Sequence, residues 1–569
     1  MARGPALRSV VVLQACICLL CMALAVQAGR FNLQRRSYSR RHDLYERQYQ
    51  STEQKNQSQV MDQYADQSKQ ASLNHDPEAL LSVINSVLGT PNINDTNAGT
   101  WAQESLGMLN PNMDDGSLKQ VPWFNNRDFP LNPTPNVNSE NVNGETAWTG
   151  LPPELNVEID NGLQPKGTHI FTLDTSMNVT DKRTADNQPI VQPFYVSHPD
   201  MYDKDKVDRV IITLPGKPRD SWKYINIHYN VLMWYCNQNK VPWNQTVLAS
   251  PAFLNQDDVQ AGGAQSNWLA YKKSGWALGG TSHHPTMQHG VSSFRVLDLM
   301  TEHFIDMFPS LKNIVFTGHS MGAQTVIRYA VAKNKKWYDP HVSYWVGNPG
   351  SYAWVVKDRP IHDPTNLNGE SCEDTINNWP YGLDGKLPAY MHDKDKNNTA
   401  GVVDRFRSRR VRLALGLLDN GAGSTQCPAQ YQGYNHLERG SLFSKALIQM
   451  PDGYPQNHSL TYISGVSHQD YEMIAAEQSV DFIFADPFDG RLVSSSRPVH
   501  HRRPPHHGPR TSSKRDWDGS TYRIIAWIIL AAFFVAIVAG LTCFNMLFKA
   551  NANDWDRDYW EYDSKRRLL

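Results

Sequence analysis

The stretch at residues 311–330, LKNIVFTGHSMGAQTVIRYA, predicts the centre of the fold. A short apolar run, IVF, leads into GHSMG at residues 318–322, after which apolar side chains recur at the three- and four-residue spacing of a helix. Strand, G-x-S-x-G and helix in this order are typical of a nucleophile elbow, a sharp turn that exposes a serine. Gly318 and Gly322 are expected there because Cβ atoms would collide with neighbouring backbone. We therefore predict that Ser320 is a nucleophile.

The composition limits the class of protein. A chain of 569 residues has room for one large domain with tails, or for two or three ordinary domains. The net charge of -1 and the lack of a basic, aromatic-rich run argue against nucleic-acid binding. We expect no metal site and no cofactor, because the histidine-rich stretch at residues 494–514 offers no fixed ligand geometry.

Two apolar segments predict a membrane-anchored protein of the secretory pathway. Residues 1–28 combine early arginines, an uncharged run and small residues near its end, which is typical of a signal peptide. Residues 524–548 form an uncharged run of about 25 residues, longer than the ~20 that cross a bilayer. The charged tail at residues 549–569 excludes a GPI signal. Basic residues flank both sides of the span, so the signal peptide sets the expected orientation: single-pass type I, with a luminal or extracellular body and a cytoplasmic tail.

The composition changes several times between these two segments. Residues 29–120 are polar and poor in large apolar residues, which predicts a disordered region with one short helix, capped by Asp76 and beginning at Pro77. Residues 121–167 are rich in Asn, Pro and Trp and predict an irregular segment that wraps the core. Residues 491–523 predict a stalk rich in Pro, His and Arg.

The secretory prediction extends to modification. Six N-x-S/T sequons are expected to carry glycans because they all lie on the luminal side: Asn56, Asn94, Asn178, Asn244, Asn397 and Asn457. Dibasic pairs at residues 35–36 and 40–41 are either processing sites or parts of a solvated basic arm.

The cysteines of the body predict one disulfide bond. Cys372 and Cys427 lie in expected loops that follow strands, in a compartment that favours oxidation, so we predict that they pair. Cys236 has apolar neighbours in a helical pattern and is expected to stay a buried thiol. The alternative pairings would involve Cys236.

Residues 168–490 predict one α/β domain. Strand-like and helix-like segments alternate, which is typical of a mostly parallel sheet covered by helices. Strands are expected at residues 210–214, 247–249, 314–316, 342–346, 411–415 and 460–463. The long insertion at residues 357–406, between two of these strands, is expected to form a lid over the site.

A serine nucleophile needs a histidine to take its proton and an acid to orient that histidine. On such a fold the acid and then the histidine follow later strands. Asp419 closes a strand-like run and precedes a turn signal, whereas the alternatives Asp384 and Asp404 precede their nearest strand. Asp419 is therefore the predicted acid.

The predicted base is His468. It follows the expected strand at residues 460–463 and precedes a helical pattern, whereas the alternative His458 lies before that strand and inside a sequon. His319, inside the elbow, is interpreted as a structural residue.

The negative oxygen that forms during acyl transfer needs two backbone donors. One is expected from Met321, directly after the nucleophile, and one from the loop after Leu214. Lys217 has an N–H in that loop and Pro218 has none, so Lys217 is the predicted second donor.

Several blocks carry a resemblance to a known family. They are GHSMGAQTVIRYA, LPGKPRDSWKYIN, VGNPGSYAWV, CEDTINNWPYGL, GLLDNGAGSTQCPAQYQG and GVSHQDYEM. As a set, over residues 168–488, they resemble a poorly characterised group of secreted or membrane-anchored α/β-hydrolases of fungi and bacteria, although Pro215 stands where many α/β-hydrolases have histidine. The resemblance implies an α/β-hydrolase fold with Ser320, Asp419 and His468 as its triad.

The sequence thus predicts a serine esterase-like hydrolase that acts on a small-molecule or lipid-like ester. Two alternatives stay open. One is a catalytically inactive hydrolase fold used for binding or adhesion, and the other is a serine peptidase or acyltransferase with the same triad.

Overall fold

The computed structural model describes residues 52–90, 148, 150–151, 154–157, 168–236, 242–364, 372–421 and 423–485. All of them belong to one compact unit, Thr52–Ser494. The predicted signal peptide, stalk, membrane span and tail lie outside the described residues, as does Asn94. Within the described residues, no helix is both long enough and apolar enough to cross a bilayer.

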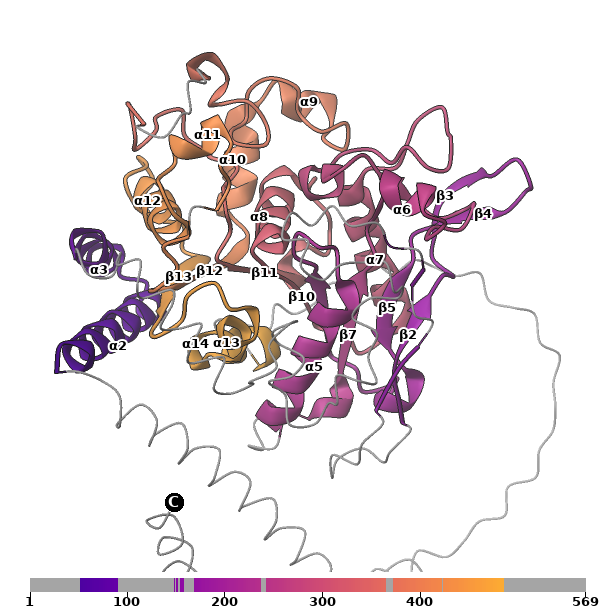
Figure 1. Ribbon diagram of the computed structural model, residues 1–569, viewed down its shortest axis with the longest axis horizontal. Helices are drawn as coiled ribbons and strands as arrows, with labels where there is room; N and C mark the ends of the chain where they lie inside the picture. Colours follow the sequence, from indigo (N-terminus) through magenta and orange to yellow (C-terminus); the bar gives the residue numbers. More distant parts are fainter. Residues whose placement is uncertain are drawn as a thin grey trace, which may run out of the picture. The chain divides into compact units, whose positions relative to one another are not determined.

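The fold is built on a mostly parallel sheet (Figure 1). Its described strands lie in the order β1-β2-β5-β7-β6-β10-β11-β12-β13. They are β1 (Glu154–Val157), β2 (Thr168–Asp174), β5 (Phe194–Ser197), β6 (Arg209–Leu214), β7 (Thr246–Pro251), β10 (Asn313–His319), β11 (Val342–Gly347), β12 (Arg410–Gly416) and β13 (His458–Ile463). The strands from β7 to β13 are parallel to one another, and β1, β2 and β5 are antiparallel to their neighbours. Each strand expected from the sequence is present.

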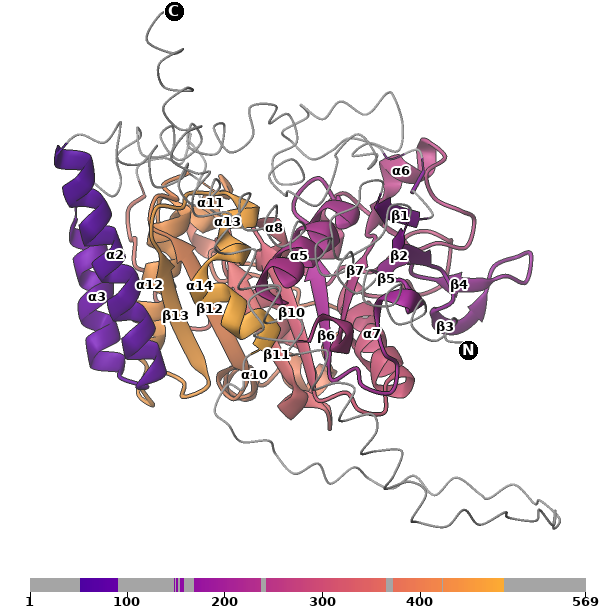
Figure 2. The same cartoon turned by 90° about the horizontal axis from the view of Figure 1, so that it is seen from below.

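Helices cover both faces of the sheet (Figure 2). One face carries α5 (Ser221–Cys236), α13 (Asp470–Ala475) and α14 (Glu477–Val480), and the other carries α7 (Ser293–Met307), α8 (Met321–Ala332), α10 (Thr399–Arg407) and α12 (His436–Ile448). Side chains of β6 alternate between the two layers: Val210 and Ile212 pack into one core cluster and Ile211 into the other. All six residues of β6 are buried, as expected for a strand covered on both faces. This mostly parallel, helix-covered sheet fits the α/β-hydrolase fold.

Smaller elements complete the unit. The remaining strands are β3 (Asn178–Arg183), β4 (Pro189–Val191), β8 (Leu254–Asn255) and β9 (Ala270–Tyr271), and the remaining helices of the core are α6 (Gln256–Gln260), α9 (Asp393–Lys396) and α11 (Cys427–Gln430). Single turns of 3₁₀ helix lie at Pro199–Met201, Trp243–Gln245, Gly275–Leu278, Asp339–His341 and Glu373–Thr375, and a π-helical turn at Asp481–Ala485.

The N-terminal region contains more structure than its composition predicted. The expected helix is α3 (Pro77–Gly89), where the side chain of Asp76 caps the N-terminus by accepting from Ala79 N at 2.9 Å. The expectation of disorder elsewhere in residues 29–120 is wrong for α2 (Thr52–Leu73), which packs on α3 and on β13. The two helices lie along the sheet edge at β13 (Figure 2).

Small and polar side chains let α2 approach this edge. Where its side chains are described, at residues 58–73, the buried ones are Met61, Ala65, Ser68 and Ala71. The hydroxyl of Ser68 accepts from Tyr462 N at 2.9 Å, and the hydroxyl of Ser72 donates to Leu460 O at 2.7 Å. These bonds satisfy backbone groups of an edge strand that would otherwise lack partners. The composition predicted disorder because this segment has few large apolar residues, whereas here small and polar side chains form the packed face.

Residues 121–167 are expected to form an irregular segment that wraps the core; this is wrong for β1, whereas Trp148, outside any strand or helix, packs on the core as expected. β1 pairs with β2 and extends the sheet, because the backbone of this segment finds an open strand edge. Trp148 is buried with its ring 4.6 Å from that of Trp222, and its backbone N donates to Asp258 at 2.6 Å.

The predicted disulfide bond between Cys372 and Cys427 is confirmed. It ties the insertion at residues 357–406 to α11, which follows the Asp419 loop. Cys236 is a free thiol but is half-buried rather than buried, and desolvation raises its pKa to about 12. The insertion also packs through Trp379, whose Nε1 donates to Leu278 O at 2.9 Å. Its action as a lid stays a prediction.

The described sequons differ in exposure. Asn178 and Asn397 are exposed, Asn244 and Asn457 are half-buried, and Asn56 lies within α2. The side-chain amide of Asn457 donates to Ser408 O at 3.0 Å. Glycosylation at these residues stays a prediction.

The contacts of α2 predict the effect of removing its serine hydroxyls. Ser68→Ala should lower the free energy of unfolding by about 1–3 kcal/mol, because the N–H of Tyr462 would be left buried without an acceptor. Ser72→Ala should lower the free energy of unfolding by about 1 kcal/mol or less, because the carbonyl oxygen of Leu460 can accept from another donor. Urea unfolding curves would measure both. Ser82→Ala, on the exposed side of α3, is the matched control and should stay within about 0.5 kcal/mol of wild type. Equal losses in Ser68→Ala and Ser82→Ala would contradict this account.

A buried acid on α13 predicts pH-dependent stability. Both carboxylate oxygens of Glu472 are buried and lack hydrogen bonds within the described residues, and desolvation raises the pKa of Glu472 from 4.5 to about 8. The folded protein therefore holds a proton that the unfolded chain releases, so stability falls as pH rises between these two values. Glu472→Gln should be more stable than wild type at pH 8 by on the order of 2–4 kcal/mol, with no gain at pH 4. Thermal melts of Glu472→Gln and of the exposed control Glu78→Gln would test this; a gain independent of pH would contradict it.

Candidate active site

Ser320 lies at the turn between β10 and α8. Its backbone has φ 57° and ψ -119°, a conformation that few residues other than glycine adopt. A Cβ atom on Gly318 would lie 2.3 Å from the carbonyl carbon of Gly322, and one on Gly322 would lie 2.5 Å from Leu214 O. The elbow is therefore a close crossing of three backbone segments that only glycine permits at these two positions. It holds the serine at the carboxyl end of β10.

The structure brings the three residues predicted from the sequence together. Ser320 Oγ lies 2.9 Å from His468 Nε2, and His468 Nδ1 lies 2.7 Å from Asp419 Oδ2. The carboxylate of Asp419 can only accept, so Nδ1 of His468 carries a proton and Nε2 is free to accept from the serine hydroxyl. Asp419 is fully buried, whereas the side chain of His468 is 37% exposed. The two hydrogen bonds thus connect a buried acid to a serine that lies next to a partly exposed histidine.

The electrostatics of this group favour a charged acid. Burial would raise the pKa of Asp419, but attraction to His468 and to His436, together with the hydrogen bond from His468, holds it well below its usual range. Desolvation lowers the pKa of His468, but attraction to Asp419 and its hydrogen bond outweigh this effect, so that the pKa is raised above 6.5. Asp419 therefore stays ionised and strengthens His468 as a base.

Other candidates from the sequence lie elsewhere. His458 is buried with Nε2 3.1 Å from Phe406 O, and Asp384 pairs with Lys357 at 3.8 Å. Asp404 is an exposed residue of α10. His319 is buried, with its ring centre 4.6 Å from that of His468, and burial lowers its pKa to about 3. Neither ring nitrogen of His319 has a hydrogen bond within the described residues, so its contacts are packing contacts.

The two predicted backbone donors belong to the start of α8 and to the loop after β6. Met321 is the first residue of α8, where a backbone N–H has no acceptor within the helix. The loop after β6, which contains Lys217, is drawn against the elbow because Gly322 sits against the carbonyl oxygens of Leu214 and Pro215. The oxyanion-binding role of both N–H groups stays a prediction.

Asn348 is a positioning residue that the sequence reading missed. It follows β11 and is fully buried with φ 47°. Its side chain accepts from Gly416 N and donates to Ser467 O, both at 2.8 Å. It therefore joins the end of β12 to the loop that carries His468. The only sequence signal was the VGNPG turn, in which asparagine is a common left-handed residue.

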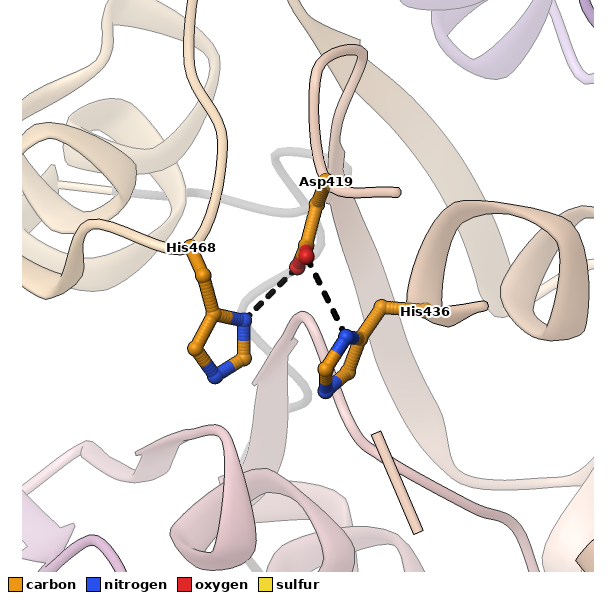
Figure 3. A group of neighbouring side chains, drawn as sticks. All are labelled: Asp419, His436 and His468. Atoms are coloured by element: carbon orange, nitrogen blue, oxygen red, sulfur yellow. Dashed lines mark hydrogen bonds and ion pairs between the residues drawn. The ribbon is translucent and has the colours of Figure 1, made fainter. Parts of the chain in front are cut away.

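His436 is a second missed residue. As the first residue of α12, it places Nδ1 3.1 Å from Asp419 Oδ1 (Figure 3). Its ring centre lies 4.2 Å from that of His468. No signal near residue 436 indicated this, because the contact depends on α12 folding back onto the Asp419 loop. Asp419, His436 and His468 also offer three donor atoms within 4.8 Å of one another, a set of types that divalent metals accept. Nδ1 of each histidine already contacts a carboxylate oxygen of Asp419. The expectation that no metal takes part stays a prediction.

Comparison with known proteins gives only distant likenesses. No family model and no curated protein matches the sequence. A poly(aspartic acid) hydrolase from Sphingomonas is 17% identical, covering 51% of this chain and 93% of its own with a TM-score of 0.35. A poly(3-hydroxybutyrate) depolymerase from Bordetella parapertussis is 16% identical, covering 57% and 92% with a TM-score of 0.35. An S-formylglutathione hydrolase from Agrobacterium tumefaciens is 13% identical, covering 55% and 92% with a TM-score of 0.31. At this level of similarity the matches carry no argument about activity.

Proposed function

We propose that this protein is a serine hydrolase that cleaves an ester or related acyl bond through an acyl-enzyme at Ser320. The observation that carries the proposal is the continuous hydrogen-bonded path from Asp419 through His468 to Ser320, which starts at a buried carboxylate and ends at a strained elbow. A structural serine would not need a strained backbone or an ionised acid behind its histidine.

The first half of the reaction forms the acyl-enzyme. Ser320 Oγ attacks the carbonyl carbon of the ester while His468 Nε2 takes its proton. Asp419 stays ionised and stabilises the imidazolium. The N–H groups of Met321 and Lys217 would donate to the oxyanion, which needs no reorganisation because the elbow already fixes the loop after β6. The bond from the carbonyl carbon to the leaving oxygen then breaks, and that oxygen takes the proton from His468.

The second half regenerates the serine. Water attacks the acyl carbon as His468 Nε2 takes a proton from it, and the tetrahedral intermediate collapses with the proton returned to Ser320 Oγ. The products are the free acid and the restored enzyme. The 37% exposure of His468 supports access of water to this step.

The substrate class is proposed as a small-molecule or lipid-like ester. A peptidase or acyltransferase would use the same three residues and differ in what binds beside them. An inactive binding protein is disfavoured because the strained backbone of Ser320 costs folding free energy that binding alone would not require.

Substitutions in the triad test the proposal. Ser320→Ala should abolish labelling by a fluorophosphonate probe and lower kcat for ester hydrolysis by about 10⁴–10⁶, because no other group forms the acyl-enzyme. His468→Ala should be similarly severe, and Asp419→Asn less so because it mis-sets only the tautomer of the histidine. The losses should not multiply in double mutants. Gln449→Ala, at the end of α12 and away from the site, is a folded control.

The probe also separates the alternatives. A wild-type protein that is neither labelled nor active on esters of any chain length would favour the binding protein. Labelling with turnover of peptides but not esters would favour the peptidase. A folded Ser320→Ala protein with the wild-type rate would remove Ser320 from the mechanism.

We further infer that this hydrolase acts on the luminal or extracellular side of a membrane, held by the segment at residues 524–548. The signal-like start and the sequons support this inference. Endoglycosidase should lower the apparent mass, and protease added to sealed vesicles should remove only the tail at residues 549–569. Digestion of the body with protection of a tag after Leu569 would contradict the orientation.

A further inference from the structure

Two imidazoles share the carboxylate of Asp419. His468 contacts Oδ2 through Nδ1 at 2.7 Å, and His436 approaches Oδ1 through Nδ1 at 3.1 Å (Figure 3). Asp419 is fully buried and the side chain of His436 is 8% exposed. A catalytic acid needs only one of these contacts, so the second calls for a physical account.

The neighbours of His436 fix its protonation. Nδ1 lies 2.8 Å from Gly421 O as well as 3.1 Å from Asp419 Oδ1, and both oxygens can only accept. Nδ1 therefore carries a proton and donates a hydrogen bond to the Gly421 carbonyl. The same N–H group, whose hydrogen is partly positive, also faces the carboxylate of Asp419. Burial lowers the pKa of His436, so the ring stays neutral. Within the described residues, Oδ1 of Asp419 has no hydrogen bond of good geometry. Its contact with Nδ1 of His436 at 3.1 Å is therefore an electrostatic one.

The backbone holds His436 against the Asp419 loop. The N–H of His436 donates to Gly421 O at 3.1 Å, and the N–H of Leu437 donates to Asp419 O at 3.1 Å. Asn435 caps the helix by accepting from Glu438 N at 2.8 Å. The positive end of α12 therefore also points at the acid. The ring of His436, tilted by 34° against that of His468, limits how far the base can turn.

We propose that His436 is a positioning residue that shares Asp419 with His468, fixing the carboxylate and moderating how strongly it holds the imidazolium. The proposal rests on the proposed function, in which His468 is the base. A carboxylate held by one imidazole only could rotate. Its charge would then act on His468 alone and would bind the protonated ring of His468 more tightly. His436 limits both effects.

The other groups near His468 remain in place in any variant of His436. They are His319 from β10 and Asp470 from α13, whose carboxylate pairs with Lys223 of α5 at 2.8 Å. Arg439 of α12 acts on His436 itself. A change in the titration of His468 in a His436 variant therefore comes from His436 itself, through the shared carboxylate or through the ring contact at 4.2 Å, and His436→Asn, which lacks the ring, separates the two.

Three variants separate positioning from simple packing. His436→Asn keeps an N–H close to the position of Nδ1, His436→Gln moves it toward the position of Nε2, and His436→Leu removes it. The kcat/KM of each variant, measured against pH with a simple ester, reports the free-enzyme pKa of His468. Protonated His468 cannot accept from Ser320, so activity falls as pH drops through this pKa, expected above 6.5 in wild type.

In His436→Leu and His436→Gln this midpoint should move up by about 0.5–1 pH unit, because Asp419 then acts on His468 alone. At pH 9, where His468 is neutral in every variant, kcat should fall about tenfold with KM little changed, since the carboxylate loses its second support. His436→Asn should restore both values to near wild type. A midpoint unchanged in folded His436→Leu and His436→Gln, or a loss seen only in KM, would overturn the proposal.

A second readout needs no turnover. Diethyl pyrocarbonate reacts with neutral imidazole, so its rate of modification of His468 against pH, followed by peptide mass spectrometry, gives the same midpoint in a Ser320→Ala background. The difference in midpoint between chains that keep His436 and chains that carry His436→Leu should persist there. If ester turnover is absent from the wild-type protein but the shift appears, the proposed function fails while the action of His436 on His468 stands. If turnover is present and the shift is absent by both methods, the inference fails alone.

Discussion

The close crossing at the elbow is the constraint on which the rest of the site depends. Gly322 lies so near the carbonyl of Leu214 that β6, the turn after β10 and the start of α8 are fixed relative to one another. Ser320, two residues before Gly322, has φ 57° and lies between the end of β10 and the start of α8. The same contact holds the start of the loop that contains Lys217 against the elbow. One steric requirement therefore acts both at the turn that carries the proposed nucleophile and at the loop that contains a proposed oxyanion donor.

A second constraint is the buried charge of Asp419. Isolated carboxylates are very costly to bury, and the groups that approach its oxygens are imidazoles rather than lysine or arginine. A permanent cation beside Asp419 would cancel its charge and weaken its pull on His468. Neutral N–H donors and the start of α12 stabilise the anion while leaving its charge available for the imidazolium that forms during turnover.

The sequence predicted those features that depend on local pattern and chain order. The elbow, the parallel strands, and Ser320, Asp419 and His468 at successive strand ends all follow from spacing that the α/β arrangement imposes. His436 and Asn348 were missed because their roles depend on where α12 and the turn after β11 come to rest. The helix α2 was missed for another reason. Its buried face uses Ala65 and Ser68 rather than large apolar side chains, so its composition was typical of a disordered segment.

This missed helix bears on the base. β13 is the edge strand of the sheet, and the chain that leaves it carries His468 only five residues beyond Ile463. Edge strands fray because one row of their backbone groups lacks partners. Ser68 and Ser72 supply partners to Tyr462 and Leu460, as Asn348 does for Ser467. Contacts at the outer edge of the sheet, as well as contacts in its interior, thus help to fix the position of His468. An N-terminal segment far from the site in sequence thereby helps to fix His468 at hydrogen-bonding distance from Ser320.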